Sequence, residues 1–323
     1  MTQCAKVLDG GFSSQLSRHV GAKFDDDPLW TARFLQTNPS AVYNTHLDYL
    51  RAGAEIIETN TYQASVPGLM KYLNISMDES LALLAKAVEL AKQAVVTYMK
   101  ENTANDKQGG EKPLVAGSCG PYGACLHDKS EYTGAYGKSM SRQELMDWHR
   151  PRIQALLDAG VDLLALETIP YAEEADALVE LLREFPRARA WLSFSCRDDR
   201  HIADGSDFRE VAVRCYRALP EQVVAVGVNC VPPNYVKTLL QGINKEERSQ
   251  DFIPLIVYPN RGGCYSETDE WIPVPDDQRI NLPVLDWLDL GVRYIGGCCK
   301  VFAEDIGAIR SLVNRCHPAE QRH

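Results

Sequence analysis

Two adjacent cysteines, Cys298 and Cys299, follow two glycines in the segment VRYIGGCCK, residues 292–300. A disulfide between neighbouring residues closes a strained ring, far from ordinary disulfide geometry. An isolated cysteine is more often a packed small apolar side chain than a ligand. A pair behind two glycines has no such packing role, whereas the glycines let the backbone bend so that both sulfurs face one ion. The pair therefore favours a metal site.

A third sulfur for this site is predicted at Cys230, which ends the apolar segment VVAVGVNC, residues 223–230. Three cysteines leave the fourth tetrahedral position of a zinc ion open, as catalytic zinc requires. The residues alone leave metal binding and plain packing both open. Cys119, Cys196 and Cys264 are expected to be packed thiols.

The sulfurs meet only if the fold brings their segments together, and the sequence predicts how. Eight apolar segments are typical of short buried strands that stop at polar or sulfur-bearing residues. They lie in residues 6–11, 51–60, 114–120, 158–168, 190–196, 223–230, 254–260 and 289–299. Helical patterns lie between them, including residues 38–53, 77–100, 141–160, 171–185 and 302–315, and several begin at a capping Asn, Ser or Asp.

Alternation of eight strands with helices predicts an α/β fold, a single (β/α)8 barrel of the TIM type that forms one domain over residues 1–323. The alternative is an open doubly wound sheet. No Gly-rich dinucleotide fingerprint follows the first strand, because LDGGFSS lacks the required glycine spacing. The barrel is therefore favoured.

In such a barrel the active site lies at the C-terminal ends of the strands. The residues expected there are Asp9 to Gly11, Glu58 to Asn60, Ser118 and Cys119, Glu167 and Thr168, Cys196, Asn229 and Cys230, Tyr258 to Asn260, and Cys298 and Cys299. The strands that precede Cys230 and Cys298 are the sixth and the eighth, which are neighbours but one. We therefore expect the three sulfurs to lie within reach of one metal ion.

Composition excludes several classes of function. The chain has 323 residues, of which 45% are hydrophobic and 24% charged, and its net charge is −10 with no block of Lys or Arg. A nucleic-acid partner is therefore not expected. The N-terminus lacks a basic region followed by an apolar run, and nowhere do eighteen apolar residues follow one another. A cytoplasmic protein that is neither secreted nor membrane-spanning is predicted.

Nine motifs together resemble the homocysteine S-methyltransferases, especially the branch that uses S-methylmethionine. They are LDGGFSS, DPLWTARFLQTNP, RAGAEIIETNTYQAS, GSCGPYGA, SEYTGAYG, LLALETIP, VGVNC, VYPNRGG and IGGCC. The resemblance runs from Leu8 to Cys299, and its most specific part is VNC paired with GGCC across an intervening strand. It implies a zinc ion held by Cys230, Cys298 and Cys299, with the homocysteine thiol in the fourth position. A sulfonium, S-methylmethionine or S-adenosylmethionine, would donate the methyl group and methionine would form.

The resemblance also bears on the residues that bind substrate. Asp9 and Glu167 match acidic positions of the family and are expected to hold the homocysteine ammonium from opposite sides of the barrel mouth, and Ser118 lies at the same mouth. Trp30 matches an aromatic residue on the methyl-donor side of the betaine-using relatives, where an indole face over a cation contributes about 0.5–2 kcal/mol. No side chain is expected to act as acid or base, since a neutral thioether leaves.

Backbone and loop features complete the predicted site. Backbone N–H groups of Gly10, Gly11 and Phe12 are expected to approach the α-carboxylate, unless they only form a tight turn. Asn229 is expected to orient the site or to touch substrate, and its alternative is a local turn. The loop of residues 120–137 is long enough to close over the mouth and exclude water.

Departures from the family pattern bear on donor and assembly. Gln63 stands where betaine users carry an extra tyrosine, which disfavours betaine as donor. Only some two dozen residues follow Cys299. Corrinoid-binding domains and a tetramer-forming extension are therefore not expected, and the protein is expected to be a monomer. Two alternatives stay open: methylation of selenocysteine or a related selenol, and a non-catalytic zinc-binding or redox-sensing barrel. The latter would not need Asp9, Glu167 or Trp30.

Overall fold

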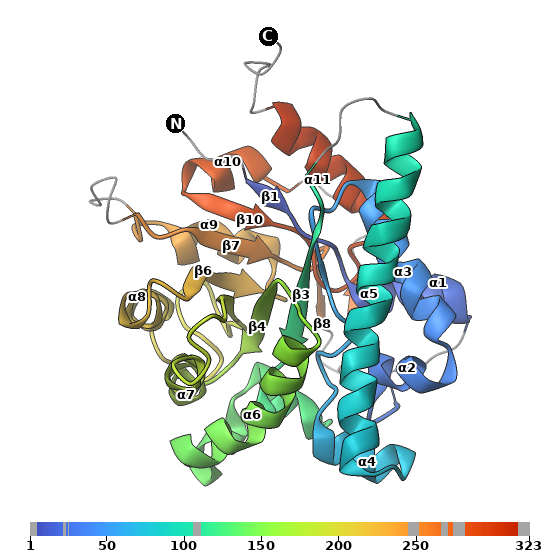
Figure 1. Ribbon diagram of the computed structural model, residues 1–323. Coiled ribbons are helices and arrows are strands. Elements are labelled where there is room, and N and C mark those ends of the chain that lie inside the picture. Colours follow the sequence, from blue (N-terminus) through green and yellow to red (C-terminus); the bar gives the residue numbers. More distant parts are fainter. Residues whose placement is uncertain are drawn as a thin grey trace.

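The computed structural model describes residues 5–21, 24, 26–105, 111–244, 252–265, 271–273 and 282–315. Within them, eight parallel strands form a barrel with helices around it (Figure 1). The strands are β1 (Lys6–Val7), β2 (Ile56–Glu58), β3 (Leu114–Cys119), β4 (Leu163–Ile169), β5 (Ala190–Phe194), β6 (Val223–Asn229), β7 (Leu255–Tyr258) and β10 (Val292–Ile295). Seven of the eight predicted segments contain one of these strands, and the segment 158–168 contains all of β4 except Ile169.

The strands close into a ring. Their hydrogen-bonded order is β1-β10-β7-β6-β5-β4-β3-β2, and a parallel bridge between Leu8 and Ile56 joins the two ends. Only β7 separates β6 from β10, so the predicted placing of the two cysteine-bearing strands as neighbours but one is confirmed. The predicted (β/α)8 barrel is confirmed as well.

The helices cover the outside of the barrel. They are α1 (Phe12–Val20), α2 (Phe34–Thr37), α3 (Pro39–Ala52), α4 (Val66–Leu73), α5 (Met77–Asn105), α6 (Arg142–Asp158), α7 (Ala172–Leu182), α8 (Phe208–Ala218), α9 (Pro233–Leu240), α10 (Val284–Asp289) and α11 (Ala303–Arg315). Side chains cap several of them as predicted: Asn38 accepts from the Ala41 N–H, and Ser141 forms a capping box with Glu144. Among the residues described, no helix combines the length and the apolar character that crossing a bilayer requires.

Apolar side chains fill both the inside of the barrel and the space between the strands and the helices, so a binding site can form only at the ends of the strands. Inside the barrel, Leu8, Ile56, Trp191, Ile256 and other buried residues form a packed cluster, and the Trp191 indole N–H donates to the Tyr258 hydroxyl over 3.0 Å. Outside it, the opposite faces of the strands pack on the helices. Every residue of β4 is buried, as expected for a strand that is covered on both faces. The barrel is thus a filled core rather than a channel.

Two segments at the barrel mouth depart from plain strand-helix alternation. The loop between β3 and α6 contains three short 3-10 turns, η2 (Tyr122–Cys125), η3 (Ser130–Tyr132) and η4 (Ala135–Ser139). An antiparallel pair, β8 (Gly263–Tyr265) with β9 (Trp271–Pro273), follows β7 and was not predicted. It is too short to show a clear alternating pattern in the sequence.

Candidate functional site

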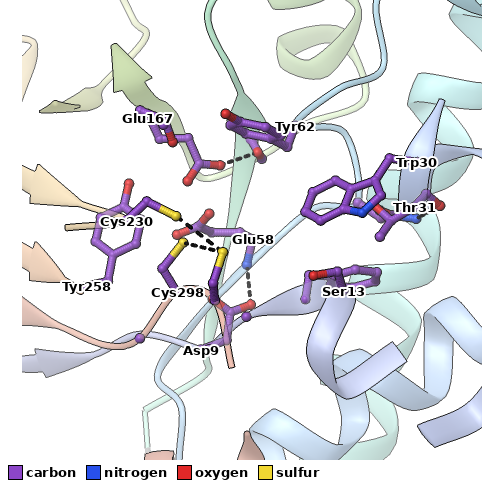
Figure 2. Close-up of a pocket in the computed structure, with 18 of the residues that line it drawn as sticks. Asp9, Ser13, Trp30, Thr31, Glu58, Tyr62, Glu167, Cys230, Tyr258 and Cys298 are labelled. Carbon is purple, nitrogen blue, oxygen red and sulfur yellow. Dashed lines mark hydrogen bonds between the residues drawn. The ribbon is translucent and has the colours of Figure 1, made fainter. Parts of the chain in front are cut away.

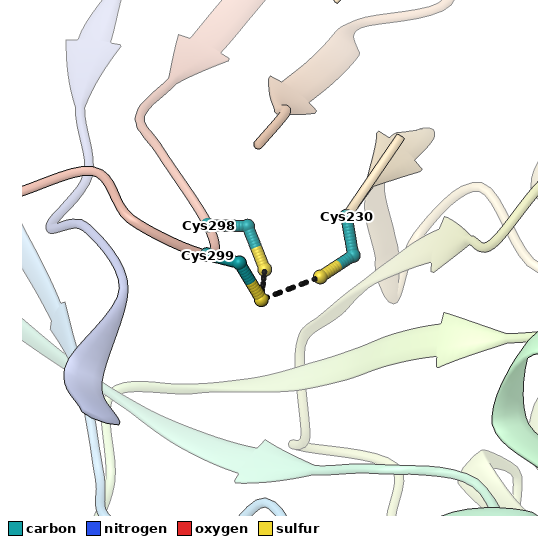
Figure 3. A group of neighbouring side chains, drawn as sticks. All are labelled: Cys230, Cys298 and Cys299. Atoms are coloured by element: carbon teal, nitrogen blue, oxygen red, sulfur yellow. Dashed lines mark hydrogen bonds between the residues drawn. The ribbon is translucent and has the colours of Figure 1, made fainter. Parts of the chain in front are cut away.

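Three thiols meet at the C-terminal ends of β6 and β10 (Figure 3). The Sγ atom of Cys299 lies 3.4 Å from that of Cys230 and 3.9 Å from that of Cys298. All three sulfurs lie within 4.8 Å of one another, and no other group of His, Cys, Asp or Glu among the described residues has the spacing to hold a metal ion. The structure therefore brings together the three cysteines that were predicted to meet.

The end of β7 ties the two cysteine-bearing turns together. The Cys230 N–H donates to the Tyr258 carbonyl over 3.1 Å, and the Cys298 N–H donates to the Pro259 carbonyl over 2.8 Å. Cys230 also has a left-handed backbone, with φ of 52°. This conformation is uncommon for a residue other than glycine and typically marks a constrained site. It turns the chain at the end of β6, where the Cys230 sulfur faces Cys299.

The two glycines before the cysteine pair serve close packing, so the predicted reason for them was wrong. Neither Gly296 nor Gly297 has a positive φ. A Cβ atom on Gly296 would lie 2.6 Å from the Asp9 carbonyl oxygen, and one on Gly297 would lie 2.1 Å from a methyl carbon of Val301. The glycines therefore let the turn that bears Cys298 pack directly against the β1 end.

Hydrogen bonds within the cluster give the three thiols different tendencies to lose their protons. Bonds accepted from Cys230 and Cys298 hold the pKa of Cys299 well below its ordinary value. The bond to Cys230 raises the pKa of Cys298, and burial adds to it. One thiolate stabilised by two thiols is the arrangement expected before a cation binds, because three adjacent thiolates would repel one another.

The other described cysteines lie apart from this group. Cys119 is fully buried, and burial raises its pKa to about 11, as expected for a packed thiol. Burial also raises the pKa of Cys125, Cys196 and Cys215. Cys4 and Cys316, and the side chain of Cys264, lie outside the described parts of the chain.

The thiols open into a cleft that is rich in acidic groups (Figure 2). Asp9, Glu58 and Glu167 line it, and they come from the ends of β1, β2 and β4. Among the described residues that line the cleft, none is Lys, Arg or His. The cleft is therefore a place for cations rather than anions.

Asp9 and Glu167 lie on either side of Glu58, which connects the three carboxyl groups (Figure 2). The Glu58 N–H donates to Asp9 Oδ2 over 2.8 Å, and the Glu58 and Glu167 side chains are hydrogen-bonded to each other. Ser118 Oγ donates to Glu167 Oε1. Burial raises the pKa of Asp9 and of Glu58, and it raises the pKa of Glu167 to about 7. Near neutral pH the group therefore retains protons that a bound cation would displace.

Trp30 lines the cleft, as the resemblance suggested, and an unpredicted aromatic residue accompanies it. Its ring meets that of Tyr62 edge to face, with centroids 6.2 Å apart. Figure 2 shows Trp30 and Cys230 on opposite sides of the space between them. Gln63 donates instead to the Pro28 carbonyl over 3.2 Å and is not among the lining residues.

The segment from Gly10 to Phe12 lines the cleft, but only part of its backbone is available. The Gly11 N–H donates to the Val301 carbonyl over 2.9 Å, so it cannot also bind a ligand. A Cβ atom on Gly11 would lie 2.4 Å from the Cys298 carbonyl oxygen. The tight turn that was the alternative explanation thus accounts for Gly11, and the uncapped first turn of α1 remains beside the cleft.

Asn229 does not line the cleft but holds a residue that does. Its Oδ1 atom accepts from the Thr168 N–H over 2.8 Å, and its Nδ2 atom donates to Thr168 Oγ1 over 2.7 Å. It is fully buried and is not among the lining residues. Of the two predicted roles, orientation fits: Asn229 holds Thr168, which follows Glu167 and has a φ of 59°.

Tyr132 is the main residue that the sequence did not single out. Its hydroxyl lies 3.6 Å from Cys230 Sγ, and it lines the cleft from turn η3. The motif SEYTGAYG contains it, but nothing in that motif distinguishes Tyr132 from Tyr136. The loop predicted to cover the mouth thus already contributes one wall of the cleft.

Comparison with known proteins agrees with this geometry. The family model described as homocysteine S-methyltransferase matches residues 6–313. The chain is 47% identical over 315 residues to the betaine-homocysteine S-methyltransferase of Drosophila melanogaster, across 95% of this chain and 94% of that one. It is 40% identical over 321 residues to the selenocysteine Se-methyltransferase of Brassica oleracea var. italica, across 96% and 89% of the two chains.

A solved structure agrees as well. The metallated form of the homocysteine methyltransferase MmuM from Escherichia coli has a TM-score of 0.82 and 40% identity, with 96% of each chain covered. The protein is therefore a methyltransferase, and it belongs to the homocysteine S-methyltransferase family.

Proposed function

We propose that this enzyme transfers a methyl group from a sulfonium donor to the thiol of L-homocysteine at a zinc ion held by Cys230, Cys298 and Cys299. The observation that carries the proposal is the meeting of three thiols and three carboxyl groups in one cleft whose described lining has no basic side chain. Such a cleft suits a metal cation, the ammonium of an amino acid and a cationic methyl donor together.

The spacing of the sulfurs supports zinc. Zinc binds thiolates at about 2.3 Å in a tetrahedral arrangement, which separates two sulfur ligands by about 3.8 Å. The Cys299 sulfur lies 3.4 Å from that of Cys230 and 3.9 Å from that of Cys298, and these distances bracket that value. When bound, zinc would keep the homocysteine sulfur deprotonated at neutral pH, where a free thiol with a pKa of about 8.5 is mostly protonated.

The acidic groups are placed to hold the acceptor. Asp9 and Glu167 would accept hydrogen bonds from the homocysteine ammonium, and Ser118 fixes one oxygen of Glu167. Free first-turn N–H groups of α1, beside Phe12, would face the α-carboxylate, since a helix N-terminus attracts anions. Held at both ends in this way, homocysteine would direct its sulfur toward the three cysteines.

The aromatic side of the cleft is placed to hold the donor. Trp30 and Tyr62 present ring surface to a cation, and Trp30 faces Cys230 across the cleft. The homocysteine sulfur would attack the methyl carbon as the bond from that carbon to the sulfonium sulfur breaks. The electron pair of that bond leaves with a neutral thioether, so no side chain has to give or take a proton. With S-methylmethionine as donor, both products are methionine.

We also propose which methyl donors and which acceptors the enzyme prefers. We expect S-methylmethionine to be preferred over S-adenosylmethionine. We expect betaine to be a poor donor, because Gln63 stands where betaine users carry an extra tyrosine and its side chain bonds the Pro28 carbonyl instead of lining the cleft. The Drosophila relative is named for betaine and the Brassica relative for selenocysteine. Selenocysteine is therefore the second candidate acceptor. We expect the enzyme to act as a one-domain monomer in the cytoplasm, which light scattering and cell fractionation would examine.

Methionine formation from homocysteine and S-methylmethionine tests the proposal, with zinc-loaded protein and with protein treated with a chelator. Turnover that a chelator abolishes and zinc restores is expected. Absence of turnover in the zinc-loaded, reduced protein would favour the non-catalytic zinc-binding barrel instead.

The assignment of the ligands has its own test. Cys230→Ser, Cys298→Ser and Cys299→Ser are each expected to lower bound zinc and to abolish turnover, because two sulfurs hold the ion less tightly. Cys125→Ser is the control, since its sulfur bonds the Gln63 carbonyl at 3.7 Å and lies outside the cluster. Full zinc content in Cys230→Ser would refute the assignment.

A further inference from the structure

The loop between β3 and α6 presents one side chain to the thiol cluster. Tyr132 in turn η3 places its hydroxyl 3.6 Å from Cys230 Sγ, within hydrogen-bonding range for sulfur. The residue is 39% exposed, so part of its ring lies at the mouth of the cleft while the hydroxyl reaches inward. Within the same turn, the Glu131 carbonyl accepts a bond from Ser195 Oγ over 2.7 Å. The turn that bears the tyrosine is therefore also held by the residue that follows β5.

One buried carboxylate holds both ends of this loop. Glu174 on α7 has no solvent exposure, and it lies outside the cleft. Its Oε1 atom accepts from the Tyr122 N–H over 2.7 Å, and its Oε2 atom accepts from the Tyr136 hydroxyl. Tyr122 begins turn η2 and Tyr136 lies in turn η4, on either side of Tyr132. Movement of Glu174 would therefore displace the loop on both sides of the tyrosine.

Two buried residues of α6 complete the arrangement. Arg152 donates to the Gly120 carbonyl over 2.6 Å and contacts His149 Nδ1 at 3.0 Å. Because a guanidinium only donates, Nδ1 must accept, and the other ring nitrogen of His149 donates to Glu174 over 2.8 Å. Burial lowers the pKa of His149, which agrees with a neutral ring. Glu174 thus receives three hydrogen bonds in a site without water access.

We propose that Tyr132 donates a hydrogen bond that orients the Cys230 sulfur for methyl transfer, and that Glu174 is the positioning residue that holds Tyr132 there. The inference rests on the proposed function, because it assigns both residues to the reaction at the thiol cluster. A hydrogen bond to a thiolate both directs the sulfur and withdraws charge from it. A displaced loop would lose that bond while the three cysteines stay in place.

Tyr132→Phe tests the first part, because it removes the hydroxyl and keeps the ring. A fall in kcat of about tenfold is expected, as for loss of a hydrogen bond to a charged group. Zinc content and the KM for homocysteine should stay unchanged. An unchanged kcat would overturn the role of Tyr132.

Glu174→Gln, made in the wild-type and in the Tyr132→Phe backgrounds, tests the second part. If Glu174 acts through Tyr132, kcat falls in the wild-type background and does not fall further in the Tyr132→Phe background. Thermal stability should fall by the same amount in both backgrounds. Equal falls in kcat in both backgrounds would mean a merely structural role, and no fall in either would remove Glu174 from the reaction.

A neighbouring residue supplies the control. Glu173 precedes Glu174 on α7, but its side chain is 41% exposed and pairs with Arg142 on the surface. Glu173→Gln makes the same chemical change one residue away and is expected to leave kcat unchanged. A fall equal to that of Glu174→Gln would show a general effect of charge on α7, which would refute the inference.

A spectroscopic measurement separates this inference from the proposed function. Protein loaded with cobalt(II) in place of zinc has sulfur-to-metal absorption bands that report on the thiolates without any turnover. Tyr132→Phe and Glu174→Gln are expected to shift these bands alike, and Glu173→Gln to leave them unchanged. Failure of the wild-type enzyme to form methionine would refute the proposed function, whereas unshifted bands in both variants would refute this inference alone.

Discussion

Glu58 lies between the two carboxyl groups that are proposed to hold the homocysteine ammonium. Its N–H bonds Asp9 and its carboxyl group bonds Glu167. An ammonium has three N–H donors, so each of the three carboxyl groups can accept one. We predict that Glu58→Gln raises the KM for homocysteine about tenfold, in line with the loss of a hydrogen bond between charged groups. The KM for the donor should not change.

An analogue without the ammonium makes this prediction specific. With 4-mercaptobutanoate as acceptor, wild-type protein and Glu58→Gln should have the same KM, because the group that Glu58 binds is absent. If Glu58→Gln impairs both acceptors equally, Glu58 has only a structural role in the cleft.

Glu167 makes both stability and binding depend on pH. Burial raises its pKa from 4.5 to about 7, so the folded protein favours the protonated form. Its contribution to the free energy of unfolding is therefore present below pH 4.5 and is lost as the pH rises to about 7. An ammonium ligand needs the ionised form, so affinity for homocysteine should rise over the same interval. Denaturant titration and calorimetry on zinc-loaded protein would measure the two trends.

Glu167→Gln should remove its share of both trends, because the amide does not titrate. The exposed Glu173→Gln is the control and should keep them. Equally steep profiles in wild-type protein and Glu167→Gln would assign the pH dependence to other groups.

Residues that belong to a specific motif could be predicted, and those defined by contacts between segments could not. Cys230, Cys298 and Cys299 share a rare residue type at two strand ends, and a barrel brings such ends together. The connection between Glu58 and Glu167 depends on side chains from β2 and β4, which are distant in sequence. The function of Asn229 in holding Thr168 is likewise visible only after folding.

At the scale of elements, packing within the turn that follows β10 should be sensitive to volume. A Cβ atom on Gly297 would lie 2.1 Å from Val301 Cγ1, well inside van der Waals contact. Gly297→Ala is therefore predicted to lower the free energy of unfolding by about 1–3 kcal/mol, as for other overpacked sites. It should also weaken zinc binding, because relief of the clash displaces Cys298. Denaturant unfolding and metal titration would measure the two effects.

Gly307→Ala is the matched control for that change. Gly307 lies within α11, and a Cβ atom there would come no closer than 3.7 Å to its nearest neighbour. Alanine favours a helix over glycine by about 0.5–1 kcal/mol, so the control should be as stable as the wild type or slightly more so. Equal destabilisation by both substitutions would contradict the packing explanation.

The strands and helices that were predicted correctly have apolar patterns that are long enough to be recognised. The features that were missed or misexplained depend on contacts between segments. Eight buried strands could be predicted because each is a short apolar run, and three of them follow a recurring helix-to-strand pattern. The β8–β9 pair is three residues on each side, which is too short for alternation to be distinctive. The reason given for Gly296 and Gly297 was wrong because a glycine in the sequence does not tell whether the backbone bends or a neighbour lies close.

At the scale of the molecule, the barrel gathers acidic groups at the ends of its strands. The chain has a net charge of −10, and the cleft gathers three carboxyl groups and three thiols without a basic side chain among its described lining residues. Net charge alone predicted only the absence of a nucleic-acid partner. The fold limits where a substrate can bind, because helices cover the outside of the barrel and its interior is packed. A cationic substrate is therefore attracted to the strand ends.

This concentration of charge leads to a prediction about the donor. S-methylmethionine and S-adenosylmethionine each carry a sulfonium, an ammonium and a carboxylate, with a net positive charge, whereas betaine is a neutral zwitterion. We predict that S-methylmethionine is the best donor, S-adenosylmethionine a weaker one, and betaine the poorest, and that the preference for cations over betaine falls as salt screens the cleft. Trp30→Ala should raise the KM for the donor more than that for homocysteine, because Trp30 faces the donor side.

Competition assays with the three donors at low and high salt would measure these preferences. Phe12→Leu is the matched control for Trp30→Ala. Phe12 lines the same cleft and lies beside the proposed site of the homocysteine α-carboxylate, so its change should affect homocysteine more than the donor. The Drosophila relative, named for betaine, is the natural comparison enzyme because it is 47% identical. Betaine as the best donor would show that Gln63 does not disfavour betaine here, and the choice of donor would then have to lie in the contacts of Trp30 and Tyr62 rather than in the charge of the cleft.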